Sequence, residues 1–107
     1  MLNKAKEESN TKIYCFDIDE TICNTPSGNY FSSVPIKERI KKINKLYDEG
    51  NEIIYHTARG SKTKINWSEL TERQLNDWGC KYHHLTTKPY ADYYIDDKAV
   101  NANKFFK

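Results

Sequence analysis

Residues 12–21, KIYCFDIDET, decide the fold of this chain. The first six are rich in β-branched and aromatic side chains and predict a buried β-strand over residues 12–17. Asp17 and Asp19 stand two positions apart at its carboxyl end, so their side chains project from the same side, within about 7 Å of each other. Neighbouring carboxylates repel unless a cation or a shared proton relieves them. The stretch predicts a strand that ends in a charged site, although a bare pair of this kind is more often two solvated aspartates in a turn.

Strand and helix signals alternate along the rest of the chain. Residues 21–34 contain Pro26, Gly28 and several small polar side chains, which indicate a long loop or a small hairpin. Pro35 is expected to be the first residue of a helix that Gly50 ends. The other expected elements are helices from about residue 67 or 68 to 78 and over 98–106, and strands over 52–57, 82–86 and 93–95.

This alternation predicts an α/β fold: a small parallel sheet covered by helices on both faces, with any site at the carboxyl ends of the strands. The 107 residues suffice for one domain, so we expect a single domain over residues 1–107. Residues 1–11 are charged or small and polar, and we expect them to form a loosely ordered lead-in.

Composition excludes several classes of function. The net charge of +2 gives no electrostatic reason to expect a nucleic-acid partner. No apolar run approaches the roughly 20 residues that a membrane helix needs, so no membrane association is expected. Three cysteines at unpatterned spacings argue against a disulfide framework and for a reducing compartment. These features together predict a soluble cytoplasmic domain.

A second acidic pair, Asp96 and Asp97, follows the last strand candidate. Carboxyl ends of parallel strands meet at one edge of a sheet, so we expect this pair to lie beside Asp17 and Asp19. Four carboxylates carry a charge of −4, and a hard divalent cation with oxygen ligands compensates such a charge. Mg²⁺ fits better than Zn²⁺ because no cysteine or histidine cluster accompanies the acids. The sequence therefore predicts a magnesium site built from these four residues.

Three further side chains are candidates for substrate binding. Thr57 ends the strand expected over residues 52–57, and Lys88 precedes a proline after the next strand. A hydroxyl and an ammonium group are what a phosphate needs beside a metal, although most threonines and lysines in such places are ordinary loop residues. Arg59 follows Thr57 by two positions. We give equal weight to a contact from Arg59 to the substrate and to a surface salt bridge.

In chain order, these residues resemble the four motifs of the haloacid dehalogenase superfamily of phosphohydrolases. The resemblance extends from the first expected strand to the last. Residues 53–60 (IIYHTARG) and 87–98 (TKPYADYYIDDK) are further similar to small phosphatases of capsule and other surface-polysaccharide biosynthesis. Glu20 departs from the pattern, since many relatives have glycine at that position. The matching residues are Asp17-x-Asp19-x-Thr21, Thr57, Lys88 and Asp96-Asp97.

The resemblance implies a role for each residue. Asp17 would be the nucleophile that forms an aspartyl-phosphate, and Asp19 the general acid/base. Thr57 would bond a phosphoryl oxygen, and Lys88 would hold the nucleophile and the phosphate in place. Asp17, the backbone carbonyl of Asp19 and the Asp96–Asp97 pair would bind Mg²⁺. Dehalogenases of the superfamily lack the second aspartate because a halide needs no proton, so Asp19 argues for phosphate esters.

The resemblance also implies a protein without a cap domain. Larger members insert a cap after the first motif or between the second and third. Here these gaps are residues 22–34 and 58–87, which are too short for a domain. A capless site is either open to bulky substrates or covered by a neighbouring subunit, which favours a homo-oligomer. The expected substrate is a small phosphorylated metabolite, with a sugar phosphate as the leading candidate.

Other functions stay open on the sequence. A response-regulator receiver uses the same residue types around Mg²⁺, but there the acidic pair comes first along the chain, and here it comes last. A non-hydrolytic Mg²⁺-binding phospho-acceptor or interaction module on the same fold would keep all of these residues. A phosphotransferase or mutase is a further alternative, although mutases of this type usually rely on a cap.

Overall fold

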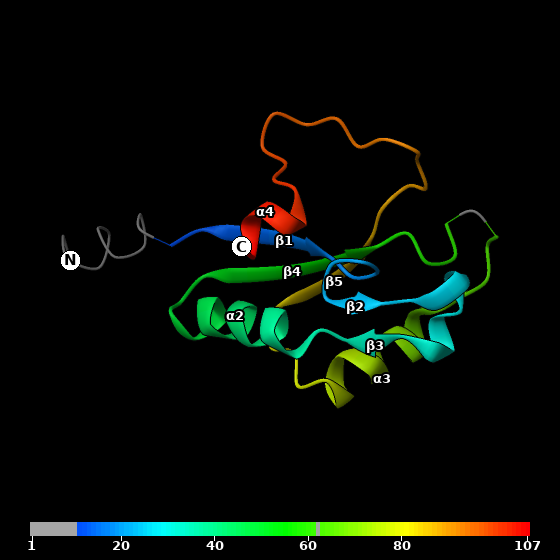
Figure 1. Ribbon diagram of the computed structural model, residues 1–107, viewed down its shortest axis with the longest axis horizontal. Coiled ribbons are helices and arrows are strands. Elements are labelled where there is room, and N and C mark those ends of the chain that lie inside the picture. Colours follow the sequence, from blue (N-terminus) through cyan, green and yellow to red (C-terminus); the bar gives the residue numbers. More distant parts are fainter. Residues whose placement is uncertain (1–10, 62) are drawn as a thin grey trace.

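The central element is a three-stranded parallel sheet (Figure 1). The structure, a computed structural model, describes residues 11–61 and 63–107, so most of the expected lead-in lies outside the described residues. The strand order is β1-β4-β5, and both pairs of neighbours are parallel. The strands are β1 (Ile13–Asp17), β4 (Glu52–Thr57) and β5 (His84–Thr87). The expected parallel α/β fold is thus confirmed.

The strand register brings the candidate residues to one edge of the sheet. Asp17 is level with His56 of the neighbouring strand, and Thr57 is level with Thr87. Lys88 follows directly, and its backbone N–H donates to the carbonyl of Thr57 at 2.9 Å. Since all three strands run in one direction, their last residues meet at the carboxyl edge, where the sequence predicted a site.

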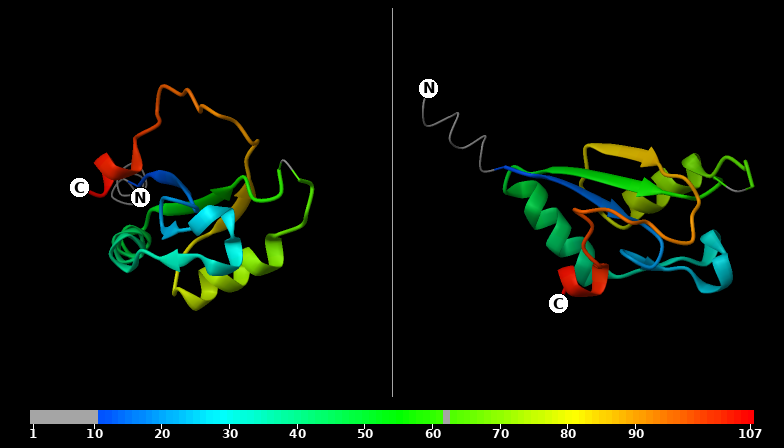
Figure 2. Two further views of the ribbon diagram at one scale, coloured as in Figure 1. Left: turned by 45° about the vertical axis from the view of Figure 1, so that its right-hand side comes forward. Right: turned by 90° about the horizontal axis from the view of Figure 1, so that it is seen from above.

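Two helices, α2 (Lys37–Asp48) and α3 (Ser68–Asp77), lie on the same side of the sheet (Figures 1 and 2). The opposite face carries exposed residues such as Cys15 and Thr86, and in the part of the chain that the structure describes no helix covers it. The expectation of helices on both faces is wrong. The alternating burial of β4 agrees with this one-sided cover, because it is typical of a strand with one buried and one wetter face.

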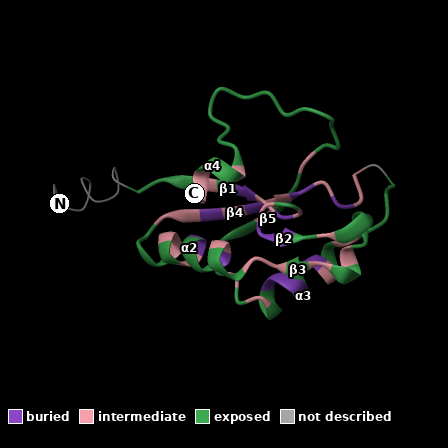
Figure 3. Cartoon of the chain, viewed as in Figure 1, coloured by how far each residue is buried: buried purple, intermediate pink, exposed green. Residues whose placement is uncertain are grey.

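The core fixes the turn that follows β1. Ile18 and Ile22, which precede and follow Asp19 along the chain, are both fully buried. Figure 3 shows buried stretches in β1, β4, α2 and α3. Burying an isoleucine side chain contributes about 1.5–3 kcal/mol, so this turn is firmly anchored. The remaining buried apolar residues come from every layer of the fold: Phe16, Cys23, Ile40, Ile43, Ile53, Tyr55 and Leu75.

A small hairpin follows the turn, which is one of the two alternatives that the sequence left open for residues 21–34. Strand β2 (Cys23–Asn24) pairs antiparallel with β3 (Val34–Pro35), and the 3-10 turns η1 (Pro26–Gly28) and η2 (Tyr30–Ser32) connect them. Pro35 therefore belongs to a strand and does not open helix α2, which begins two residues later. An edge strand tolerates proline because its missing N–H faces away from the partner.

The segment 89–101 differs from the sequence prediction. Every one of its residues is exposed, and it contains neither a strand nor a helix. In Figure 1 it arches away from the sheet before α4 (Ala102–Phe105) returns to β1. The expected strand over 93–95 is absent, with Tyr93 83% and Ile95 96% exposed. The closing helix spans four residues instead of nine, and its Phe105 packs against Tyr14 and Phe16.

None of the helices in the described ranges, 11–61 and 63–107, combines the length and apolar character needed to cross a bilayer. No cap domain is visible beside the sheet in these residues either. The hairpin that follows β1 and the loop that follows β4 begin in the two short gaps, residues 22–34 and 58–87, where larger members of the resembled family insert a cap.

Candidate functional site

The carboxylate of Asp17 is held at the end of β1 by two contacts. Its Oδ1 accepts a hydrogen bond from the backbone N–H of Ile18 at 2.8 Å, and its Oδ2 lies 3.0 Å from Nζ of Lys88. The Asp17 side chain remains 34% exposed, so a ligand can reach it from solvent. This arrangement fixes the direction of the carboxylate without burying it.

Lys88 is positioned by its surroundings on three sides. Its backbone N–H bonds Thr57, and its carbonyl accepts a hydrogen bond from Oγ of Ser61 at 2.7 Å. The ring of Tyr94 covers the ammonium group, with Nζ 4.2 Å from the ring centre. A cation over an aromatic face is stabilised electrostatically, so Tyr94 and Asp17 together hold this ammonium in place.

Asp19 is bound by Arg59 through a two-pronged ion pair. Nε of Arg59 donates to Oδ2 at 3.0 Å, and one terminal nitrogen donates to Oδ1 at 2.8 Å. The hydroxyl of Thr25 also donates to Oδ1, at 2.6 Å. Burial, the largest single influence, acts to raise the pKa of the Asp19 carboxyl, but the hydrogen bonds from Arg59 and Thr25 outweigh it and hold that pKa below its usual value.

Arg59 has no donor left for a substrate. Its side chain is fully buried, and its remaining N–H groups donate to Thr71, Gln74 and Ser33, at 3.2, 2.6 and 3.3 Å. The guanidinium also lies over the ring of Tyr30, 4.6 Å from its centre. A guanidinium has five N–H donors, and here all five are engaged within the protein. Of the two alternatives left open by the sequence, the structure shows a salt bridge, and this bridge is buried rather than on the surface.

Thr57 is hydrogen-bonded to one residue of each ion pair, Lys88 and Arg59. Its side chain is buried, and its Oγ1 accepts a hydrogen bond from the backbone N–H of Arg59 at 3.0 Å. A hydroxyl that accepts one bond can still donate its own hydrogen. Thr57 can therefore donate to an oxygen atom placed at the carboxyl edge of β4.

The structure does not bring Asp96 and Asp97 to this edge. Both lie in the exposed segment 89–101, where Oδ1 of Asp96 accepts a hydrogen bond from the backbone N–H of Lys98 at 2.8 Å. No group of three or more metal-ligating side chains occurs among the residues described. In this arrangement both oxygens of Asp19 are also occupied by Arg59. The donor set expected for Mg²⁺ is thus not assembled, because the strand that would carry the second pair is not formed.

Several residues of the site were not predicted. Thr25 and Ser33 from the hairpin, Tyr30 between them, and Thr71 and Gln74 from α3 all surround the Asp19–Arg59 pair. Thr71 and Gln74 are three positions apart and buried. Two polar residues on the face of a helix that packs on the sheet are the one signal that would have indicated a buried charge.

His56 and Cys15 lie on the face of the sheet that carries Asp17. The register sets His56 level with Asp17, and Cys15 precedes Asp17 by two positions on the same strand. Burial, followed by the nearby Lys88 ammonium, lowers the pKa of His56 against the opposing effect of Asp17. Partial removal from water by neighbouring groups likewise raises the pKa of the Cys15 thiol. Both shifts keep these side chains neutral beside the Asp17–Lys88 pair.

No family model and no curated protein matches this sequence. The fold resembles the crystal structure of an MCSG target protein from Vibrio cholerae, with a TM-score of 0.81 and 24% sequence identity. The match covers 90% of this chain and 88% of that chain. What the two share is the fold. At this identity the likeness supports the α/β architecture and carries no information about activity.

Proposed function

We propose that this protein is a phosphatase that hydrolyses a phosphate monoester through an aspartyl-phosphate on Asp17. The observation that carries the proposal is the ion pair between Asp17 and Lys88, 3.0 Å apart at the carboxyl edge of the sheet beside Thr57. It combines an oriented, solvent-accessible carboxylate with a cation and a hydroxyl that can receive phosphoryl oxygens. Phosphoryl transfer asks a protein mainly for such positioning and charge neutralisation.

The proposed reaction has two displacements. In the first, a carboxylate oxygen of Asp17 attacks phosphorus, the bond from phosphorus to the ester oxygen breaks, and that oxygen takes up a proton from Asp19. In the second, water attacks phosphorus, the bond to Asp17 breaks, and the proton from water returns to Asp19. A covalent intermediate of this kind divides one difficult substitution into two easier ones.

The contact with Arg59 affects the two displacements differently. A lowered pKa keeps Asp19 ionised at neutral pH, which suits a general base that accepts a proton from water. The same shift opposes the acid step, in which Asp19 must carry a proton. We therefore expect the first displacement to be the slower one for esters with poor leaving groups.

The steps above describe only what the side chains of this protein do. The Mg²⁺ requirement inferred from the sequence stays a prediction. The homo-oligomer expected of a capless site stays a prediction as well. The same holds for membership of the haloacid dehalogenase superfamily. We place the proposed activity in the cytoplasm, since the three cysteines are free thiols.

One observation favours the alternative of a non-hydrolytic phospho-acceptor. Arg59 binds both oxygens of Asp19, and a carboxylate held in that way is poorly placed to activate water. Such a protein would accept a phosphoryl group on Asp17 and release it slowly. Turnover separates the two functions, because only a phosphatase releases many phosphates from each protein molecule.

The test is phosphate release from a panel of sugar phosphates, nucleotides and p-nitrophenyl phosphate, each measured with Mg²⁺ and with EDTA. We expect multiple turnovers with at least one ester, none after Asp17→Asn, and normal rates in the control Asp77→Asn, which alters an exposed carboxylate on α3. Near-normal rates in Asp17→Asn would refute covalent catalysis by this residue. A single phosphoryl group retained on the protein would favour the phospho-acceptor.

A further inference from the structure

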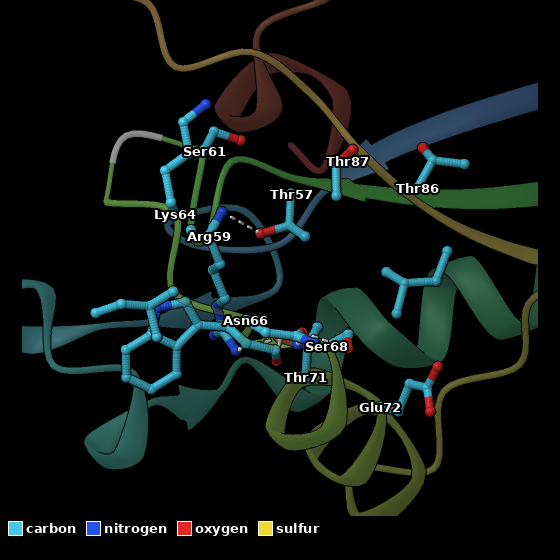
Figure 4. Close-up of a pocket in the computed structure, with 14 residues that line it drawn as sticks. Thr57, Arg59, Ser61, Lys64, Asn66, Ser68, Thr71, Glu72, Thr86 and Thr87 are labelled. Atoms are coloured by element: carbon cyan, nitrogen blue, oxygen red, sulfur yellow. Dashed lines mark hydrogen bonds between the residues drawn. The ribbon is translucent and has the colours of Figure 1, made fainter.

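A cavity of about 370 Å³ lies beside Thr57, between the carboxyl ends of β4 and β5, the loop that follows β4 and the start of α3 (Figure 4). Small-molecule sites commonly enclose about 300–1,000 Å³, so this cavity is large enough for a metabolite. Neither Asp17 nor Asp19 is part of its lining. The cavity therefore adjoins the proposed reaction site without containing it.

Two contacts join the cavity to the reaction site. Thr57 belongs to its lining and, in the proposed function, also donates to the phosphoryl group. Ser61 belongs to its lining as well, and its hydroxyl holds the backbone carbonyl of Lys88. A phosphate bound by Thr57 and Lys88 would thus stand at the boundary of the cavity. The organic group of the ester would extend from there into the cavity.

The polar part of the lining consists mainly of uncharged groups that donate and accept hydrogen bonds. Thr87 is level with Thr57 on the face of the sheet that α3 covers, and its hydroxyl forms no hydrogen bond to any residue in the described ranges. Asn66 uses its Oδ1 to accept from Ser68, which leaves its amide N–H groups. Hydroxyls and amides of this kind match the hydroxyl groups of a ligand, which also donate and accept.

The rest of the lining favours a ligand with apolar C–H surfaces and no strong charge. Trp67, Ile65 and Leu85 supply the apolar surface of the cavity. Lys64 and Glu72 are the exposed charged residues of the lining, one of each sign, and Figure 4 draws them on opposite sides. The remaining charged residue of the lining, Arg59, is paired with Asp19, so the lining carries no excess of either charge. Sugars and polyols present this combination of hydroxyl groups and C–H faces.

The wall that carries Trp67 is held in place before any ligand binds. The rings of Tyr30 and Phe31 pack edge-on against Trp67, with centroid distances of 5.0 and 5.5 Å. The loop closes tightly at Gly60, whose carbonyl accepts from the backbone N–H of Lys64 at 2.8 Å. A pre-formed wall avoids the entropic cost of ordering a loop when the ligand binds.

We propose that this cavity binds the polyhydroxylated leaving group of the ester, a sugar or polyol, and that Trp67, Asn66 and Thr87 determine its specificity. The proposal rests on the proposed function, because it assumes that the phosphate is held by Thr57 and Lys88. It goes further by assigning the place in the fold and the residues that recognise the organic group of the ester.

The chain has two tryptophans, Trp67 in the cavity and Trp78 outside it, which allows binding to be measured without turnover. In an Asp17→Asn/Trp78→Phe protein, Trp67 is the sole tryptophan and the proposed nucleophile is absent. We expect its fluorescence to respond to glucose 1-phosphate, ribose 5-phosphate or sorbitol 6-phosphate, and not to inorganic phosphate alone. A response to phosphate of the same size would overturn the proposal.

Substitutions in the cavity then test the assigned residues. In the same background, with binding measured by isothermal titration calorimetry, Thr87→Val and Asn66→Ala should each weaken sugar-phosphate binding about five- to tenfold, the loss of one hydrogen bond, and leave binding of inorganic phosphate unchanged. The control Asn76→Ala removes an exposed amide on α3, outside the cavity, and should change neither. Equal weakening for phosphate and sugar phosphate would overturn the assignment.

Two further outcomes separate this proposal from the one on which it rests. Tighter binding of nucleoside monophosphates than of any sugar phosphate would overturn the ligand class, since a base stacked on Trp67 would then explain the cavity. Binding of sugar phosphates with the expected losses in the variants, but without hydrolysis by the intact protein, would support the cavity and refute the phosphatase.

Discussion

Arg59 and Asp19 form a buried two-pronged ion pair, with N–O distances of 3.0 and 2.8 Å between groups 40 residues apart in the chain. The other guanidinium nitrogen bonds Thr71 and Gln74 of α3. The pair thus links the turn after β1 to a helix on the covered face of the sheet. Arg59, for which the sequence left a substrate contact and a surface salt bridge equally open, connects three parts of the fold. The charge of Asp19 is therefore coupled to the stability of the protein.

Removing the arginine should be costly. We expect Arg59→Met to lower the free energy of unfolding by about 3–5 kcal/mol at pH 7, because it leaves Asp19 partly buried without its partner. Urea denaturation measures this loss. The control is Arg73→Met, which breaks an exposed pair with Glu69 on α3 and should cost less than about 1 kcal/mol. Similar small losses in both variants would mean that Arg59 does not stabilise the fold.

The pair should also make stability depend on pH on the acid side. The pKa of Asp19 is lower in the folded protein than its usual value of 3.8, so the pair stabilises the fold fully above that value. This stabilisation is lost as pH falls through the lowered pKa. The difference in unfolding free energy between wild type and Asp19→Asn should therefore shrink as pH falls below 3.8, in urea titrations at a series of pH values. A difference that stays constant with pH would contradict this linkage.

The sequence was sufficient to predict the parallel sheet and the edge where the site lies. The composition of residues 12–17 and 52–57 predicts strands. The carboxyl ends of parallel strands always lie at the same edge of the sheet. Asp17, Thr57 and Lys88 therefore lie together as predicted.

The conformation of Glu20 is relevant to its departure from the family pattern. Glu20 adopts a positive φ of 61°, and its carboxylate accepts a hydrogen bond from the backbone N–H of Thr25 at 2.8 Å. The position at which many members of the resembled family have glycine is one that favours glycine.

What the sequence did not predict depends on long-range packing. The strand over 93–95 was inferred from three apolar residues, and a run so short forms a strand only where a neighbouring strand pairs with it. The partners of Arg59 were also out of reach, because Ser33, Thr71 and Gln74 carry no motif of their own. Local composition predicts elements, whereas the partner of a buried charge is decided by how those elements pack.

The second acidic pair provides a test of the predicted magnesium site. Asp96 and Asp97 are exposed, so Asp96→Asn/Asp97→Asn should change the free energy of unfolding by no more than about 0.5 kcal/mol in EDTA. If segment 89–101 folds back toward Asp17 around Mg²⁺, binding to the folded state alone raises Tm by mass action.

We expect Mg²⁺ to raise the Tm of the wild-type protein and to leave the Tm of the double variant unchanged, as measured by calorimetry. Asp92→Asn, in the same exposed segment, is the control and should keep the response. A rise of equal size in the double variant would show that Mg²⁺ binds without the second pair.

The loop that walls the cavity should depend on the absence of a side chain at Gly60. Gly60 and Gly79 both have positive φ, 81° and 73°, and a side chain is strained in that region by about 1–2 kcal/mol. They differ in their surroundings. A Cβ at Gly60 would lie 2.1 Å from the carbonyl oxygen of Ile65, whereas a Cβ at Gly79 meets nothing within 4 Å.

We therefore expect Gly79→Ala to lose only the strain energy, and Gly60→Ala to lose at least about 1 kcal/mol more because the loop must shift. Urea denaturation of the two variants measures the difference. The displaced loop also carries Trp67, so Gly60→Ala should weaken sugar-phosphate binding and Gly79→Ala should not. If both variants lose the same free energy and bind alike, the loop adapts to a side chain at no cost, and the wall of the cavity is not pre-formed.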